Sequence, residues 1–257
     1  MLQKRRSEII EKIKTQRMVK VADLVNEYQV SIETIRRDLE YLESAGYLRR
    51  VYGGAVIDGL LSQEPVYSHR EVINYEEKSA IGIKTAELIE DGDTLFIDVG
   101  TTTLEVARNI KDKKDITVIT NATLIANEMI KADRCRIILL GGELRPGELS
   151  VSGHICDNNL QNFYANKLIM GVGGISLQSG YTDYHVNEAN TRRCMIERAG
   201  KIIAVADYSK FGVTAMNFVC PITRVEKLIT DWSVPKETIK EFRENGINVT
   251  IANKKIT

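Results

Sequence analysis

Six short apolar runs alternate with helical stretches in the second part of the chain, and this alternation constrains the fold more than any other feature. The runs span residues 94–97, 116–119, 136–140, 167–170, 201–205 and 225–229. Buried parallel strands are continuous apolar segments, and helices connect them across the faces of their sheet. Residues 76–257 are therefore predicted to form an α/β domain around a parallel sheet.

Almost every apolar run is followed by small or polar residues. In open α/β sheets, ligands bind just beyond the carboxyl ends of the strands, so these segments are expected to meet in one crevice. Gly171-x-Gly173 does not complete a dinucleotide-binding motif, because Ser176 stands where the last glycine belongs, and no cofactor is expected. The candidate ligand residues in these segments are Asp98, Gly100, Thr101, Thr102, Thr120, Asn121, Gly141, Gly142, Gly173 and Lys210.

The segment from Gly100 to Thr103 has two interpretations. Free N–H groups and hydroxyls at the start of a helix hold anions such as phosphate, but the same residues also make an ordinary strand-to-helix turn. Asp98 would repel an anion and suits a sugar hydroxyl or a role in fixing the loop, whereas Lys210 supplies positive charge.

The first part of the chain has the pattern of a small helical DNA-binding module. Apolar residues at helical spacing predict an amphipathic helix over residues 2–14, and a second helix is expected over 22–28. Ser31 is a good N-cap for a third helix. The apolar stripe of this third helix consists of Ile32, Ile35, Leu39 and Leu42.

The face opposite that stripe presents Arg37, flanked by Glu33, Thr34 and Tyr41. An exposed helix of this kind, preceded by a short helix and turn, suits insertion into the major groove of DNA. Arg36 lies nearer the buried edge, where it reaches a phosphate or pairs with Glu33 or Glu40. Residues 47–56 then form two β-prone runs around a Gly-Gly turn, which predicts a wing. The candidate DNA contacts are Ser31, Glu33, Thr34, Arg36, Arg37, Tyr41, Arg49, Arg50, Tyr52 and Gly53.

The segment from Ser31 to Leu39, placed before a Gly-Gly wing, resembles the helix-turn-helix signature of the DeoR family of bacterial regulators. Similar segments continue through the second part, among them 98–102, 120–121, 141–145, 171–174 and 207–212. The resemblance implies that the first 57 residues bind double-stranded operator DNA. It also implies a Rossmann-like sensor domain similar in fold to ribose-5-phosphate isomerase. The effector would be a phosphorylated sugar, polyol or sugar acid held by the Gly100–Thr102 loop with Asp98, Asn121, Glu188 and Lys210.

The sequence departs from the family pattern at Gly173 and Ser176, where many members carry an acid. General acid–base catalysis needs a carboxylate within hydrogen-bond reach of the sugar, so this departure disfavours an enzyme. Residues 181–185 either help to define the effector or form a surface loop.

Composition adds weaker constraints. Residues 1–56 contain eleven Lys and Arg against eight Asp and Glu, a charge of +3, which leaves −3 on the remainder. This asymmetry fits a DNA-binding head on an acidic body. The four cysteines and three histidines have no metal-ligand spacing, and neither a membrane span nor a signal peptide is found. We expect a cytoplasmic homo-oligomer without a metal site.

We predict three parts: a winged helix-turn-helix at 1–57, a linker and lead-in at 58–75, and a sensor domain at 76–257. Tyr67, Val72, Ile73 and Tyr75 are expected to pack on the body. Two other functions remain open at this point, a sugar-phosphate isomerase with an accessory DNA-binding head and an architectural DNA binder that senses nothing.

Overall fold

The chain forms two compact units, residues 1–74 and 75–257. The computed structural model describes residues 2–16, 18–44, 47–56, 64 and 66–254. Most of the expected linker, residues 57–63 and 65, lies outside this described part.

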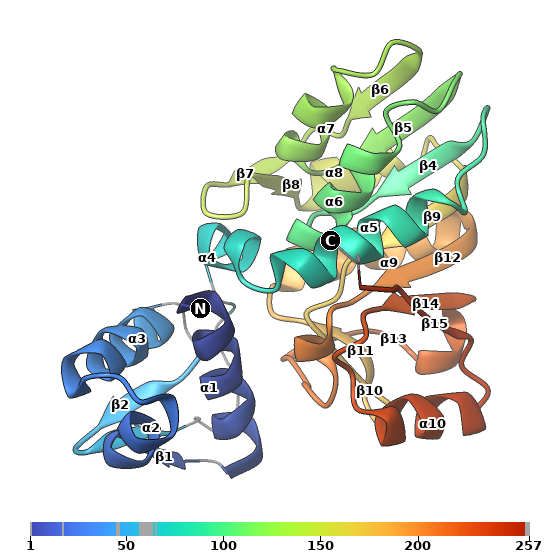
Figure 1. Ribbon diagram of the computed structural model, residues 1–257. Helices are drawn as coiled ribbons and strands as arrows, with labels where there is room; N and C mark the ends of the chain where they lie inside the picture. The colour runs from blue at the N-terminus through green and yellow to red at the C-terminus, as the bar shows by residue number, and fades with distance from the viewer. Residues whose placement is uncertain (1, 17, 45–46, 57–63, 65, 255–257) are drawn as a thin grey trace. The chain divides into compact units, whose positions relative to one another are not determined.

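The first unit is a winged helix-turn-helix (Figure 1). Its antiparallel sheet has the order β1-β3-β2, and Val19 of β1 pairs with Ala55 of β3. The first strand had not been predicted from the sequence, because it lacks a turn signal such as the Gly-Gly pair that marks the wing strands. The elements are α1 (Leu2–Gln16), β1 (Met18–Lys20), α2 (Val21–Tyr28), α3 (Ile32–Ser44), β2 (Arg49–Val51) and β3 (Gly54–Val56).

Helices α1, α2 and α3 share one apolar core. The stripe of α3 was predicted correctly for Ile35, Leu39 and Leu42, which are buried against Ile9 and Leu24. The prediction for Ile32 was wrong, since its side chain is 50% exposed. Ile32 is the first residue of α3, and the core begins one turn later.

A fourth helix, α4 (Tyr67–Val72), belongs to the first unit. Ile73 joins the core of this unit rather than packing on the body as expected. Ser7 donates a hydrogen bond to the side-chain carbonyl of Asn74 over 3.2 Å. Val72 and Tyr75 are 42% and 50% exposed. The compact first unit therefore extends to Asn74, well past the wing.

A buried carboxylate ties α1 to α3. Asp38 is 1% exposed, and it accepts hydrogen bonds from Arg5 Nε over 2.6 Å and from Arg6 Nε over 2.7 Å. Two of the basic residues near the N-terminus thus have a structural role. Breaking a buried ion pair leaves an uncompensated charge, which is strongly destabilising.

Asp38→Ala should destabilise the first unit by about 3 kcal/mol, because Arg5 and Arg6 lose their common partner. Hydrogen exchange of peptides from α1 and α3 measures the change. Glu27→Ala is the matched control, since the Lys12–Glu27 pair is much more exposed and should matter by less than about 1 kcal/mol. Equal protection of α1 and α3 in the two variants would contradict a structural role for Asp38.

The second unit is built on a seven-stranded parallel sheet of order β15-β14-β12-β9-β4-β5-β6. All six predicted strands are present within two residues of their expected bounds, so the predicted fold class is confirmed. The edge strand β15 had not been predicted. The strands are β4 (Thr94–Ile97), β5 (Ile116–Thr120), β6 (Cys135–Leu139), β9 (Ala165–Met170), β12 (Ala199–Val205), β14 (Lys227–Thr230) and β15 (Val249–Ile251).

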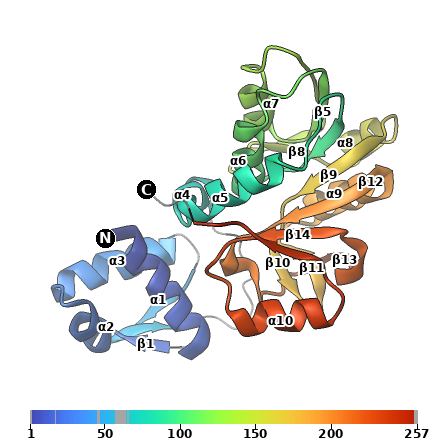
Figure 2. The same cartoon turned by 45° about the vertical axis from the view of Figure 1, so that its right-hand side comes forward.

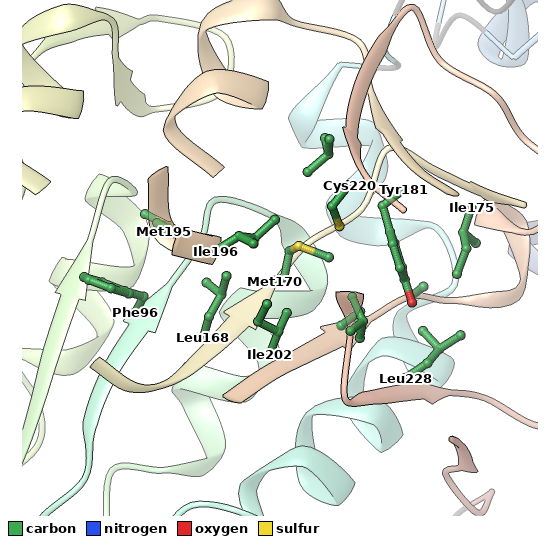
Figure 3. Close-up of a cluster of buried hydrophobic side chains, with 14 of the residues drawn as sticks. Phe96, Leu168, Met170, Ile175, Tyr181, Met195, Ile196, Ile202, Cys220 and Leu228 are labelled. Atoms are coloured by element: carbon green, nitrogen blue, oxygen red, sulfur yellow. The ribbon is translucent and has the colours of Figure 1, made fainter. Parts of the chain in front are cut away.

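Helices cover both faces of this sheet (Figures 1 and 2). One face carries α5 (Tyr75–Ala86), α6 (Thr101–Asn109) and α7 (Thr123–Met129), and the other carries α8 (His154–Leu160), α9 (Val186–Arg198) and α10 (Lys236–Glu244). Alternation along the strands supplies both cores. Phe96 and Leu168 enter the core on the face of α8, α9 and α10, which is drawn in Figure 3. Leu95 and Ile169 enter the core on the face of α5, α6 and α7.

Short antiparallel elements complete the unit. The hairpin of β7 (Glu143–Arg145) and β8 (Ser150–Ser152) follows β6. A small sheet consists of β10 (Gly174–Ser176), β11 (Gly180–Asp183) and β13 (Asn217–Cys220), and two 3-10 turns are η1 (Tyr208–Lys210) and η2 (Ile222–Arg224). Residues 181–183 lie buried in β11, so this part of the predicted 181–185 segment is not a surface loop. Within the described ranges, no helix has the length and apolar character required to cross a membrane.

Candidate functional site

The predicted crevice segments follow five adjacent strands, β12, β9, β4, β5 and β6. The chain proceeds from β4 outward to β5 and β6, then returns to place β9 on the other side of β4. This reversal between β4 and β9 is a topological switch point, where open α/β sheets bind ligands. The register aligns Ile97 with Thr120 and with Ile169. The residues that follow these three positions therefore lie side by side at the carboxyl ends of the strands.

Helix α6 begins at this switch point, directly after Gly100. Its first helical hydrogen bond runs from the Leu104 N–H to the Gly100 carbonyl over 3.1 Å, and no side chain caps its start. The amides of the residues between them therefore have no helical acceptor. Thr103 donates its hydroxyl to the Gly100 carbonyl, while Thr101 and Thr102 are 6% and 8% exposed. Amides arranged in this way favour an anion.

A buried cation lies beneath the switch point. Arg192 of α9 donates from Nε to Asp98 Oδ2 over 2.5 Å and from Nη1 to Asp183. All three residues are at most 3% exposed. Asp98 Oδ2 also accepts the Gly171 N–H over 3.2 Å, which joins the loops after β4 and β9. The sequence interpretation did not include Arg192 or its bridge.

The bridge sets the charge of these groups. Burial raises the pKa of Asp98 to about 6, against the opposing effect of Arg192. Burial disfavours the charged form of Arg192, but Asp98 and Asp183 outweigh this and raise the pKa of the guanidinium. Of the two roles open for Asp98, fixing the loop matches these contacts.

The polar residues after β5 are buried. The Thr120 hydroxyl donates to the Ile97 carbonyl over 2.6 Å and accepts the Ala122 N–H over 3.1 Å, so it ties β5 to β4. Asn121 is fully buried, and among the described residues neither its Oδ1 nor its Nδ2 has a hydrogen-bond partner. Asp98 Oδ1 also has no hydrogen-bond partner in the described part of the chain. Unpaired buried polar atoms are costly and often mark functional positions.

Glu188 lies in the wall of the site. Its carboxylate, 2% exposed, accepts the Ser150 hydroxyl over 2.6 Å and Arg145 Nη1 over 3.1 Å. These contacts join α9 to the β7–β8 hairpin.

The predicted glycines have packing roles. A Cβ atom on Gly142 would lie 2.7 Å from the Ser152 carbonyl oxygen, and one on Gly141 would lie 3.3 Å from Asn159 Nδ2. A Cβ on Gly173 would lie 2.9 Å from the Thr182 carbonyl oxygen, which accepts the Gly173 N–H over 3.1 Å. The close approach of β11 therefore leaves no space for a side chain at Gly173.

Lys210 belongs to a second charged cluster, after β12. Burial alone would raise the pKa of Asp207, but the charges of Lys78 and Lys210 and hydrogen bonds from Ser209 outweigh it and lower the pKa. Burial, with the nearby charge of Asp207, raises the pKa of Asp231 to about 7. Asp231 accepts the Tyr208 N–H over 2.7 Å and so holds η1 in place. The contributions of Lys78 and Asp231 were missed because they are far from the 207–210 motif in sequence.

The first unit presents a separate polar surface on α3. Ser31 caps the helix as predicted, accepting the Thr34 N–H over 3.2 Å, and its hydroxyl lies 2.8 Å from that of Thr34. Arg36 lies 3.9 Å from Glu33, one of its two predicted acidic partners. Arg37 is exposed on this helix.

The wing presents Tyr52 at its turn, where the side chain is fully exposed, next to Gly53 with a φ of +78°. Gly53 is therefore in the left-handed region that favours glycine. Arg50 is engaged inside the unit, because its Nε donates to Glu43 over 2.6 Å. The Arg49 side chain lies outside the described part of the chain.

Tyr41 is not the open residue that the helical wheel predicts. Arg6 lies 3.7 Å above its ring, and the ring of His69 is 4.7 Å away. Helix α4, distant in sequence, covers this side of α3.

The two units together define a class of protein, a DNA-binding regulator that joins a winged helix-turn-helix to an α/β sensor. Family models match both units, a DeoR-like helix-turn-helix domain over residues 5–59 and a DeoR C-terminal sensor domain over residues 73–232. The chain belongs to the DeoR family of transcriptional regulators.

Similar proteins span nearly the whole chain. The transcriptional repressor AccR of Agrobacterium fabrum (strain C58) is 35% identical over 93% of this chain and 96% of its own. The glycerol-3-phosphate regulon repressor of Escherichia coli (strain K12) is 33% identical over 96% of this chain and 98% of its own. A solved ribose-5-phosphate isomerase in complex with phospho-erythronic acid matches with a TM-score of 0.41 and 15% identity, covering 53% of this chain and 54% of its own.

Arg192→Met should lower the free energy of unfolding by about 3–5 kcal/mol, because Asp98 and Asp183 lose their buried counter-ion. Urea denaturation followed by circular dichroism measures this change. Arg134→Met removes an arginine that pairs with Asp115 while 59% exposed, and should cost less than about 1 kcal/mol. Similar losses in the two variants would show that the buried bridge has no special weight.

Proposed function

We propose that the protein represses a carbohydrate-utilisation operon and that a phosphorylated sugar, polyol or sugar acid controls its binding to operator DNA. The observation that carries the proposal is the uncapped start of α6 at the switch point, where the Thr101 and Thr102 amides lack helical acceptors. The similar repressor of the glycerol-3-phosphate regulon supports a phosphorylated polyol or a related compound as the effector class.

The effector phosphate would bind the α6 amides, with Lys210 adding positive charge. The Asp98 carboxylate does not prevent this, because Arg192 offsets its charge from below. Asn121 suits a sugar hydroxyl, since both polar atoms of its amide are unpaired among the described residues. Small rearrangements of the loops would bring the buried Asn121 amide into contact with the ligand.

A sugar-phosphate isomerase is the weaker alternative. Catalysis needs a carboxylate free to move a proton, whereas Asp98 and Glu188 are bonded to Arg192 and Arg145. Gly173 has no room for an acidic side chain beside β11. The similar full-length proteins are transcriptional repressors.

Operator binding would place α3 in the major groove, with Arg37 reading bases and the wing against the backbone. Each chain carries one helix-turn-helix, and such modules bind paired half-sites as dimers. We therefore propose a cytoplasmic homo-oligomer.

Coupling between ligand and DNA would begin at the chain junction. Lys78 lies in the first turn of α5, four residues after the first unit ends at Asn74, and its charge acts on Asp207 near Lys210. A ligand anion at Lys210 would alter the charge balance that Lys78 experiences. A coupling free energy of about 1–3 kcal/mol is sufficient for regulation.

Arg37→Ala should weaken binding to the operator by about 1–3 kcal/mol and relax base preference, because a base-reading contact is lost. Fluorescence anisotropy with an operator duplex and a scrambled duplex measures both effects. Arg36→Ala is the control and should lower affinity for the two duplexes alike. An unchanged ratio of the two affinities in Arg37→Ala would exclude Arg37 as a reader of bases.

Lys210→Ala should abolish the response to the effector, and Thr101→Ala should weaken it, because it removes the hydroxyl but keeps the backbone amide; both should leave operator affinity unchanged. Anisotropy of the operator complex, titrated with a panel of sugar and polyol phosphates, tests both. Lys201→Ala is the control, since Lys201 is 60% exposed and pairs with Glu226. A full response in both site variants would exclude Lys210 and the Thr101 hydroxyl as effector contacts, and loss of DNA binding itself would indicate a folding role.

A further inference from the structure

A hollow lies away from the switch point, between α10 and the edge strand β15. It has a volume of about 620 Å³, and its apolar wall includes Trp232, Ile239 and Ile251. Figure 1 shows α10 and β15 at the end of the sheet opposite β6. Pockets of about 300–1,000 Å³ with mainly apolar walls and a few polar groups are typical of small-molecule sites.

The rim of this hollow is basic. Lys236, Lys240 and Arg243 line it together with one acid, Glu244. Lys240 pairs with Glu244 over 3.7 Å, and Arg243 donates to the Val249 carbonyl over 3.0 Å. Lys236 has no acidic partner among the described residues. A further cation, Lys254, lies 5.8 Å from the centre of the Trp232 ring.

The basic residues of α10 line the hollow, whereas most of its acidic residues do not. The helix also contains Glu237 and Glu241, but neither of these acids lines the hollow. The helix as a whole is therefore balanced in charge, whereas the surface that borders the apolar wall is positive. An apolar wall with a positive rim is complementary to a molecule with an apolar body and an anionic group.

We propose that this hollow binds a small amphipathic anion, an apolar body carrying a carboxylate or phosphate, with the body against Trp232 and the anion at Lys236. The site is distinct from the α6 site in position and in chemistry, because a sugar phosphate has no apolar body to place against the tryptophan. Ile239 and Phe242 of α10 are buried, and Phe242 packs against Phe211 with ring centres 5.3 Å apart. Helix α10 therefore contacts both the hollow and Phe211, the residue that follows Lys210.

The chain offers a local readout, because Trp232 is its single tryptophan. The full-length protein is titrated with octanoate, which is transparent where tryptophan absorbs, and in parallel with 1-octanol. We expect octanoate to shift the Trp232 emission in a saturable manner and to protect the ring from acrylamide quenching. The neutral alcohol should bind about fivefold more weakly or worse, because it lacks the charge-assisted contact.

Lys236→Glu is the decisive variant. It reverses a rim charge at the first residue of α10, where an acid favours the helix dipole, so folding should be preserved. Octanoate affinity should fall about fivefold or more, while the affinity for 1-octanol should not change. Lys201→Glu, a reversal at an exposed lysine on β12, should leave both affinities unchanged.

Three results would overturn the proposal. One is the absence of any saturable change in Trp232 emission with octanoate. Another is equal affinity for octanoate and 1-octanol that Lys236→Glu leaves unchanged. A third is a Trp232 emission that shifts on dilution of the protein alone, which would mean that a second copy of the chain covers the hollow. None of these measurements requires DNA or a sugar phosphate, so the outcome is independent of the proposed function.

Discussion

The buried bridge of Arg192 to Asp98 and Asp183 is the interaction on which the arrangement of the sensor unit depends. It joins the end of β4 to the end of β11 and the middle of α9, two consecutive elements that lie more than eighty residues further along the chain. Buried ion pairs contribute little net stability compared with apolar packing, but they are costly to break. The main effect of the bridge is therefore to select one arrangement of these loops, since any other arrangement would leave a charge unpaired inside the protein.

The same bridge makes an anion site possible beside an acidic residue. Asp98 precedes the start of α6 by three residues, close enough to oppose any anion bound there. Arg192 offsets that charge from within the core, and Arg145 does the same for Glu188. The acids that the family resemblance assigns to sugar binding are, in this structure, parts of the wall that holds the loops.

The sequence predicted local elements well because their signals are local. An apolar run such as Leu95–Ile97 followed by Asp98 and Gly100 marks a strand and its end without any knowledge of the neighbours. Strand order could not be predicted, because it depends on which strands pair across the switch point. The strand β15 has only three residues and, unlike the equally short wing strands, no Gly-Gly turn beside it to mark it.

The missed site residues have a common physical cause. Arg192 lies in a stretch rich in charge, where Thr191 and Arg193 give no sign of a buried face. The sequence signal for a buried cation was Asp98, the partner of Arg192, because an acid at the end of a buried strand requires a cation nearby. Tyr41 shows the converse, since a helical wheel treats α3 alone and cannot include the His69 ring supplied by α4.

Each unit has its own apolar core, one around Ile35 and Leu39 and the others around the parallel sheet. Signals between units with separate cores need not involve unfolding, and they require only that a ligand bind one arrangement better than another. Residues 73–75 form the junction between the two units. Ile73 is fixed in the core of the first unit and Asn74 is bonded to Ser7, while the next residue, Tyr75, begins a helix of the second unit. The junction therefore joins a segment packed in the first unit to a helix of the second unit through a single peptide bond.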